Sequence, residues 1–298
     1  MPRVIEPGEV GRVGQLGSGD VLAALALVTR GTVFDLDVGR FVGMPQWDGH
    51  PTFLLTSFRT PHGSRHDGDL AILDPSQNTD DLRFQTELMV TGMHIGTHLD
   101  ALNHVACGTD GDRFYGGYGP DDVGDYGPQR ADAASIPPII VRAAVFDMAA
   151  LIEVDRLPAG ARISIDDLKR AESEQGAVPQ GGALLLRTGL MSTWPNKSEF
   201  AAAAGAGIDT EAAEWLAEER GVVLVGSDTP TVEQVPSANL SNPHPVHDLF
   251  LRRLGIHLLE NLWLEELVAR RERSVTLVCL PLKIEGATAS MVRPVALV

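Results

Sequence analysis

The residues best suited to chemistry lie in one short segment, which holds three of the nine histidines and a carboxylate within eleven positions. They are His94, His98, Asp100 and His104. Two neutral imidazoles and a carboxylate form a ligand set that suits Zn, Mn or Fe and leaves coordination positions open for water and substrate. If the same residues only capped a helix or closed a turn, several polar groups would lack the partners that a metal supplies together. We therefore predict a catalytic metal site held by His94, His98 and Asp100.

Regular secondary structure cannot bring these ligands to one ion. An extended strand would separate His94 from Asp100 by about 20 Å, at ~3.3 Å per residue. A helix would turn Asp100 about 200° away from His98, onto its far face. A tight irregular turn remains, and Gly96 is the residue that can adopt the unusual backbone angles this turn requires. The sequence thus predicts a turn at Gly96 that folds His94 back over His98 and Asp100.

His104 follows Asp100 by four residues, close enough to approach the same pocket. Histidine titrates near neutral pH, so this side chain could take a proton from water and return it to a leaving nitrogen. We predict that His104 is the catalytic acid and base. Two alternatives stay open: His104 as a further metal ligand, or as a group that only orients the ligands.

The elements that must position this segment alternate between strand and helix. Strands are expected at 32–36, 53–58, in the run ending at Val90, and at 139–146, 183–187, 222–225 and 275–282. Helices are expected after Asp20, after the capping box of Ser164 and Asp167, after Asp209, and over 247–254. The region 108–138 is rich in Gly, Pro, Asp and Tyr, which indicates long loops. The pattern predicts a single α/β domain with a mixed sheet over 32–298, preceded by an N-terminal extension over 1–31.

Composition limits the classes of partner. The net charge of −16 and the pI near 4.9 disfavour nucleic acid and anionic membrane surfaces, so a small-molecule substrate is expected. Two cysteines are too few for a disulfide framework or a cysteine zinc site. The apolar run 21–28 is too short to cross a bilayer and lacks the flanks of a signal peptide. A cytoplasmic protein is therefore expected.

The spacing His-x-Gly-Thr-His-x-Asp-x-x-x-His at positions 94–104 resembles the signature of the cyclase family, which contains bacterial kynurenine formamidases and isatin hydrolases. Other segments are similar to that family as well, at 44–47, 181–189, 226–230, 259–262 and 280–283. The similarity extends from about residue 32 to the C-terminus. This chain differs from shorter family members by the N-terminal extension and by insertions near 59–81 and 108–138. The substrate of those members therefore cannot be assigned to this chain from the resemblance.

The resemblance implies a swivelling β/β/α fold and a homodimer or homotetramer. It implies a metal-dependent hydrolase that opens an amide-type C–N bond in an arylformamide or a cyclic amide such as isatin. One or two Zn or Mn ions per chain are expected. In dinuclear members Asp100 would bridge to a second ion held by a later His and Glu, here His247 and Glu260, with His244 and His257 as alternatives to His247.

Three residues are also predicted to bind substrate: Trp47, Thr97 and Asp228. An indole at position 47 could stack on a planar substrate, although plain core packing is equally compatible with its type.

Two rival functions use the same residues. A non-haem iron oxygenase could use His98 and Asp100 with a distant His247 or His257, but it would require an all-β barrel and leave His94 without a role. A catalytically inactive metal-binding protein would leave His104 without a reason to lie beside the ligands.

Overall fold

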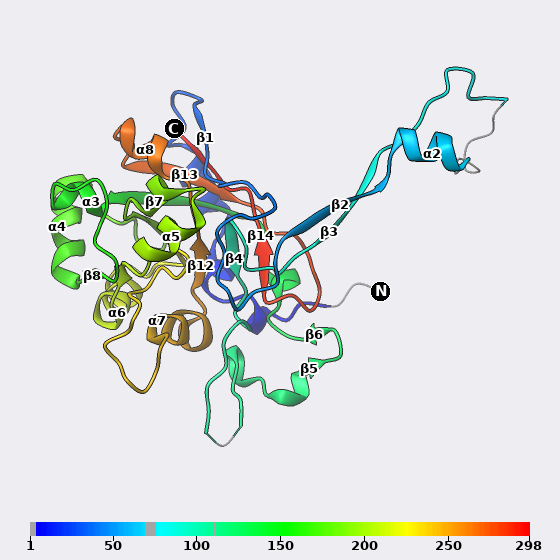
Figure 1. Ribbon diagram of the computed structural model, residues 1–298. Helices are drawn as coiled ribbons and strands as arrows, with labels where there is room; N and C mark the ends of the chain where they lie inside the picture. Colours follow the sequence, from blue (N-terminus) through cyan, green and yellow to red (C-terminus); the bar gives the residue numbers. More distant parts are fainter. Residues whose placement is uncertain (1–3, 69–75, 110) are drawn as a thin grey trace.

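The computed structural model describes residues 4–68, 76–109 and 111–298 (Figure 1). Its largest element is a nine-stranded sheet in the order β1-β15-β13-β7-β9-β11-β12-β4-β14. The bounds are β1 Val33–Asp35, β15 Val295–Leu297, β13 Ser274–Cys279, β7 Ile139–Asp147, β9 Ala183–Arg187, β11 Leu224–Ser227, β12 His257–Glu260, β4 His98–Asp100 and β14 Ala289–Met291. β7, β9, β11 and β12 run parallel and the outer strands pair antiparallel. The predicted mixed α/β fold is confirmed.

The central strands are apolar because both of their faces are covered. Along β7, Ala144 and Phe146 belong to one buried cluster, whereas Ala143 and Val145 belong to the other. Helices α4 (Ile165–Gln175) and α6 (Thr210–Glu219) contribute to the first cluster, and α8 (Glu265–Ala269) contributes to the second. Strands buried on both faces read as continuous apolar runs, which is why 139–146 and 183–187 were recognisable.

Local signals set several helix ends as predicted. Ser164 and Asp167 form a capping box at the start of α4, and the Asp209 carboxylate accepts from the backbone N–H of Ala212 at the start of α6. The helix predicted over 247–254 begins earlier, as α7 (Pro245–His247), because proline is favoured at the first position of a helix. It continues as a π-helical turn, Asp248–Leu254, that ends at Gly255.

The described part of the N-terminal extension is folded against the body. It contains the short turns Pro7–Glu9 and Arg12–Gln15 and the helix α1 (Ser18–Leu25), which lies on β7 and β13. Glu9 is buried, accepts from the backbone N–H of Ala131 and pairs with Arg130. Within the described ranges no helix is long and apolar enough to cross a membrane.

The two predicted insertions have different forms. The first lies in an arm that projects from the body in Figure 1, made of β2 (Leu54–Arg59), α2 (Pro61–Asp67) and β3 (Thr86–Val90); residues 69–75 lie outside the described ranges. The second, apart from residue 110, is loop with short turns, as predicted, and includes β5 (Val123–Gly124) and β6 (Gly127–Pro128). The remaining elements are α3 (Met148–Leu151), α5 (Lys197–Ala203), β8 (Arg162–Ile163), β10 (Gly207–Ile208) and turns at Tyr115–Gly117, Pro120–Asp122, Ala133–Ser135 and Leu190–Thr193.

Candidate metal centre

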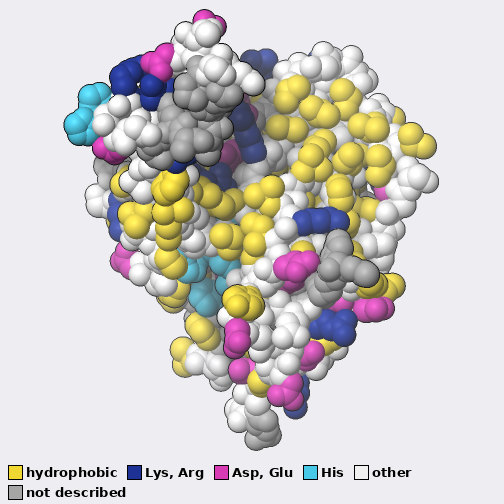
Figure 2. All heavy atoms as spheres, turned by 90° about the vertical axis from the view of Figure 1, so that its right-hand side faces the viewer, with side chains coloured by type: hydrophobic (Ala, Val, Ile, Leu, Met, Phe, Trp, Pro, Cys, Tyr) yellow, Lys and Arg dark blue, Asp and Glu magenta, His cyan; other side chains and the backbone are white. Residues whose placement is uncertain are grey.

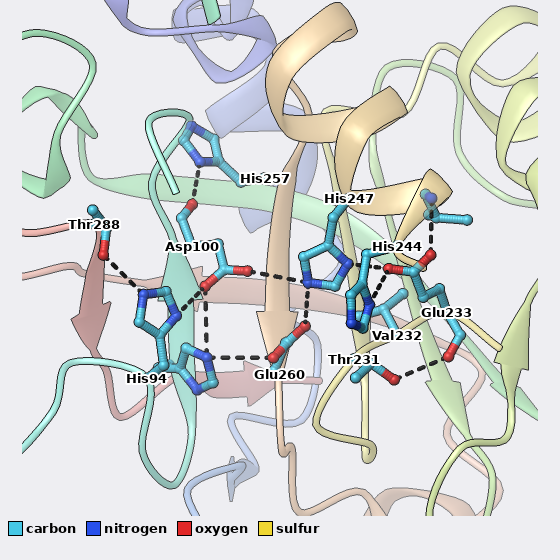
Figure 3. Close-up of polar contacts among 12 residues, drawn as sticks. His94, Asp100, Thr231, Val232, Glu233, His244, His247, His257, Glu260 and Thr288 are labelled. Carbon is cyan, nitrogen blue, oxygen red and sulfur yellow. Dashed lines mark hydrogen bonds and ion pairs between the residues drawn. The ribbon is translucent and has the colours of Figure 1, made fainter. Parts of the chain in front are cut away.

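Strand pairing brings three of the predicted ligands together. His98 and Asp100 are two residues apart on β4, so their side chains share one face of the sheet. β12 runs antiparallel beside β4 with Glu260 directly opposite His98. As a result, His98 Nε2 lies 3.5 Å from Asp100 Oδ1 and 3.3 Å from Glu260 Oε2 (Figure 3).

The predicted turn at Gly96 is confirmed and brings His94 to the same place. Gly96 has a φ of +57°, in the left-handed region that favours glycine. The turn leaves His94 Nδ1 at 2.9 Å from Asp100 Oδ1, while His94 Nε2 lies 3.0 Å from the hydroxyl of Thr288. The chain reversal at Gly96 therefore brings His94 next to Asp100, which neither a strand nor a helix could do.

Gly96→Ala should destabilise the fold more than the matched change Gly31→Ala. Both glycines are left-handed, at φ of +57° and +65°, so an added Cβ costs roughly 1–2 kcal/mol at either position. At Gly96 the Cβ would also lie 3.2 Å from Met44 Cε and 3.4 Å from the Gly39 carbonyl oxygen, whereas nothing lies within 4 Å at Gly31. Crowding of this kind adds about 1–3 kcal/mol. Urea unfolding with chelator present measures the difference, and equal losses for the two variants would contradict it.

His247 completes the cluster from the opposite side. Its Nε2 lies 3.8 Å from Asp100 Oδ2 and 3.4 Å from Glu260 Oε1. Of the two alternatives, His257 turns its Nδ1 to the backbone carbonyl of Asp100, at 2.7 Å, and His244 lies behind His247, beside Glu233. Figure 3 shows His247 pointing at both carboxylates while His257 points away from them. The structure thus brings together His94, His98, Asp100, His247 and Glu260.

The donor atoms of this cluster fit a divalent cation. His98 Nε2, both oxygens of Asp100 and Glu260 Oε1 are buried and make no hydrogen bond of acceptable geometry. Buried polar atoms without partners are rare, because each costs its full desolvation free energy. The separations of 3.3–3.5 Å around His98 match the ~3.4 Å expected between donors that bind one tetrahedral ion at ~2.1 Å. Two imidazoles and two carboxylates around one point are a typical donor set for such an ion.

The electrostatics of the cluster also favour a cation. Burial raises the pKa of the Asp100 carboxyl, but the facing imidazoles of His94 and His98 outweigh it and lower that pKa overall. For His98 and His247 burial lowers the pKa of each ring, yet the adjacent carboxylates outweigh it and raise both. The carboxylates thus create a negative potential that attracts positive charge, and a bound metal would displace protons from these imidazoles.

The predicted catalytic residue, His104, lies beside the cluster. Its ring centroid is 3.9 Å from that of His94 and 6.1 Å from that of His247. Burial lowers the pKa of His104 to about 3, so its imidazole is neutral at neutral pH. Within the described residues no hydrogen bond from the His104 ring to protein is seen, which leaves its nitrogens available for proton transfer.

Two residues of the site were not predicted. His50 places its Nδ1 3.0 Å from the backbone carbonyl of His94, and its ring lies between those of His94 and Trp47. Glu233 is buried, accepts from the backbone N–H of Val246 and contacts Nδ1 of His247. Neither carries a local signal, because each stands alone in a loop and reaches the site only through the tertiary fold.

Glu233→Gln should weaken metal binding about 10–100-fold, which is the usual cost of losing the group that orients a metal-binding histidine. The Glu233 carboxylate fixes the proton on His247 Nδ1 and so leaves Nε2 as the donor atom facing Asp100 and Glu260. Burial raises the pKa of Glu233, but His244 and His247 outweigh it and lower that pKa to about 2, so the group is ionised. Competition with a metal-chelating dye measures the affinity. The exposed Glu218→Gln is the matched control, and an unchanged affinity in Glu233→Gln would refute the role.

The three residues assigned to substrate binding lie in different surroundings. Trp47 is 68% exposed and packs its edge on His50, at the approach to the cluster. Thr97 is buried, donates to the Asn261 carbonyl and accepts from the backbone N–H of Val38. Asp228 is buried and accepts three hydrogen bonds from Thr188 and Gly189, although burial raises its pKa to about 6. The side chain of Thr97 therefore holds the backbone beside His98, whereas that of Asp228 holds the turn at Thr188 and Gly189.

Fold and site together define an α/β protein with a buried centre of histidines and carboxylates. The family described as putative cyclase matches residues 34–234, and the chain belongs to this family. The fold is not the all-β barrel that the oxygenase alternative required.

Curated relatives and a solved structure agree with this family. A kynurenine formamidase of Paracidovorax citrulli is 33% identical over 203 residues, 68% of this chain and 74% of that protein. An isatin hydrolase of Roseibium aggregatum is 27% identical over 224 residues, 72% of this chain and 75% of that protein. A kynurenine formamidase of Bordetella petrii is 43% identical, but the match covers only 28% of this chain and 35% of that relative. The crystal structure of a novel cyclase has a TM-score of 0.83 at 23% identity and covers 97% of this chain and 96% of its own, so it shows the same fold.

Proposed function

We propose that this chain is a metal-dependent hydrolase that opens an amide-type C–N bond in a small molecule. The observation that carries the proposal is that His98 Nε2, both oxygens of Asp100 and Glu260 Oε1 are buried without hydrogen bonds. Together with His247 Nε2 these atoms have the spacing of metal ligands. Relatives named kynurenine formamidase and isatin hydrolase support this reaction class. Both names describe hydrolysis of a carbonyl–nitrogen bond.

The ligands would be His94, His98 and Asp100, with His247 and Glu260 on the other side of Asp100. Because both oxygens of Asp100 face imidazoles, at 2.9 Å from His94 and 3.8 Å from His247, this carboxylate can serve one ion or bridge two. The donor set suits Zn or Mn. When bound, such an ion lowers the pKa of coordinated water to about 7 and polarises a carbonyl group.

His104 would move the protons. Its neutral imidazole accepts a proton from the attacking water and then donates it to the nitrogen that leaves. Its ring lies against His94, so the proton carrier is held beside the ligands without being fixed by other hydrogen bonds. Such a positioned acid and base typically contributes 10²–10⁴-fold to the rate.

The substrate class follows from the approach to the cluster. The rings of Trp47 and His50 are in edge-to-face contact, with 4.9 Å between their centroids. The His50 ring in turn lies 5.3 Å from the His94 ring, again between centroids. A planar aromatic substrate can stack on such rings while its amide reaches the ligands. Arylformamides and cyclic amides such as isatin combine these two features.

Hydrolysis of N-formylkynurenine and of isatin by the purified full-length protein tests the proposal. We expect turnover of one of these substrates, loss of turnover after chelation, and recovery after Zn or Mn is restored. The chelated and reloaded samples are compared by circular dichroism, so that loss of metal is separated from loss of fold. Turnover that persists in metal-free folded protein would contradict the proposal.

A further inference from the structure

A buried carboxylate of the N-terminal extension, Glu9, holds a loop that lies far along the chain. The Glu9 side chain has no exposed surface. Its Oε2 accepts from the backbone N–H of Ala131 at 2.9 Å, and its Oε1 accepts from Arg130 Nη1 at 3.1 Å. Arg130 follows Glu9 by 121 positions, so these contacts exist only in the folded chain.

The loop that Glu9 holds is bound in turn to Asn103, the residue before His104. Asn103 donates from its backbone N–H to the Ala131 carbonyl at 3.2 Å, and from its Nδ2 to the Arg130 carbonyl at 2.7 Å. Asn103 is itself buried. Two successive pairs of hydrogen bonds therefore connect the Glu9 carboxylate to the backbone beside His104.

Ala131 has a backbone conformation that needs support from both sides. Its φ of +51° lies in the left-handed region that alanine rarely adopts. Strained conformations of this kind persist only where the surrounding structure determines them, and they cluster at functional sites. The N–H of Ala131 is fixed by Glu9 and its carbonyl is fixed by Asn103. If Glu9 releases the N–H, Ala131 can relax and the Asn103 segment moves with it.

The next residue of the extension contacts a second part of the site. The Val10 carbonyl lies 3.4 Å from His257 Nε2, and His257 Nδ1 lies 2.7 Å from the Asp100 carbonyl. Glu9 and Val10 thus support two neighbouring segments of the candidate metal centre.

The burial of a charged side chain at position 9 points to a role other than stability. Taking a carboxylate out of water costs free energy, and apolar residues in such places are often equally or more stable. Figure 2 shows histidine side chains reaching the surface on the side of the molecule from which the arm projects. Glu9 has no exposed surface, so it cannot contact a substrate that enters from that side. It acts only through the residues that it holds.

We propose that Glu9 is a positioning residue: through the loop 130–131 it holds the His104 imidazole beside the metal centre. The inference rests on the proposed function, in which His104 moves the protons. Within the described residues the His104 ring makes no hydrogen bond to protein, so its position depends on its backbone and on its packing against His94. A misplacement of about 1 Å in an active site can cost about 100-fold in rate.

Glu9→Gln in the full-length protein with Zn added tests the proposal. The amide keeps the size of the side chain, but its NH₂ group would face a donor, either the Ala131 N–H or the Arg130 guanidinium. We expect kcat to fall about 10–100-fold, while KM and metal content keep the values of the parent. Steady-state kinetics and elemental analysis of one preparation measure these quantities. An unchanged kcat, or loss of metal, would overturn the role.

Two variants of the same extension are the matched controls. Glu6→Gln makes the same change at an exposed carboxylate. Arg12→Gln removes the hydrogen bond from Arg12 Nη1 to the Ala217 carbonyl, 2.8 Å long, and so loosens the extension at another anchor. Both variants should keep the kcat of the parent. An equal fall of kcat in Arg12→Gln and Glu9→Gln would show that the extension only supports the fold.

The imidazole signals in a ¹⁵N-edited NMR spectrum give a readout that does not require turnover. The His104 signals are assigned by their absence from His104→Ala. We expect Glu9→Gln to shift them and Arg12→Gln to leave them in place; unchanged His104 signals in folded Glu9→Gln would overturn the proposal. If the parent hydrolyses neither N-formylkynurenine nor isatin, the proposed function fails, and the His104 signals still decide whether Glu9 positions this ring.

Arg130→Gln keeps the proposal testable if Glu9→Gln does not fold. The Arg130 side chain is 40% exposed, and its loss removes only one of the two contacts between Glu9 and the loop. This variant should shift the His104 signals and lower kcat by a smaller factor than Glu9→Gln. His104 signals and a kcat equal to those of the parent would refute the connection.

Discussion

Asp100→Ala should lose metal and hydrolytic activity together. The carboxylate of Asp100 lies 2.9 Å from His94, 3.5 Å from His98 and 3.8 Å from His247. Among the described residues it is therefore the one carboxylate that contacts all three of these imidazoles. Losing a group that merely orients a ligand costs about 10–100-fold in metal affinity, so loss of this central ligand should exceed roughly 100-fold. Elemental analysis and turnover number measured on the same preparation check the result.

The stability of the metal-free variant separates loss of a ligand from loss of fold. The Asp100 carboxylate is buried but faces three imidazoles that hold its pKa down in the folded chain, so its removal also takes away a stabilising partner of those rings. Chelated Asp100→Ala should therefore unfold at a lower temperature than the chelated parent while keeping the circular dichroism spectrum of the folded chain. Asp125→Ala, at an exposed carboxylate, should keep metal and activity. Full metal content in Asp100→Ala would show that the carboxylate is not a ligand.

His104→Ala should keep the metal and lose about 10²–10⁴-fold in kcat, which is the usual contribution of a positioned acid and base. The centroid of its imidazole lies 3.9 Å from that of His94, close enough for His104 to serve the reacting groups. The contacts among His98, Asp100, Glu260 and His247 do not involve His104. Steady-state kinetics and metal content of the same sample measure the two effects separately.

The exposed His66→Ala is the matched control for this variant and should behave as the parent. Loss of metal from His104→Ala would make His104 a ligand, which was the alternative left open by the sequence. An unchanged kcat with metal retained would remove His104 from the mechanism.

Much of the site could be predicted because its main signals are local. The spacing of His94, His98 and Asp100 excluded strand and helix over the whole segment, and only a turn at Gly96 was left; the structure has that turn. Capping residues and continuous apolar runs likewise predicted α4, β7 and β9 close to their observed bounds. In each case a few neighbouring residues determine the backbone.

The remaining parts of the site depend on tertiary contacts. The sequence favoured His247 by its distance before Glu260 but left His244 and His257 open. The direction of each side chain is set by the helix start at Pro245 and by the pairing of β12 with β4. His50 reaches His94 across 44 positions, and Glu233 reaches His247 across 14. No periodicity or motif signals contacts of this kind.

The measurement that tests the account most directly is the metal content of the full-length protein purified without added metal, determined by elemental analysis. The account predicts one or two Zn or Mn ions per chain, released by chelation and restored on reloading. Folded protein that contains no such ion, and that binds none when Zn or Mn is added, would contradict it.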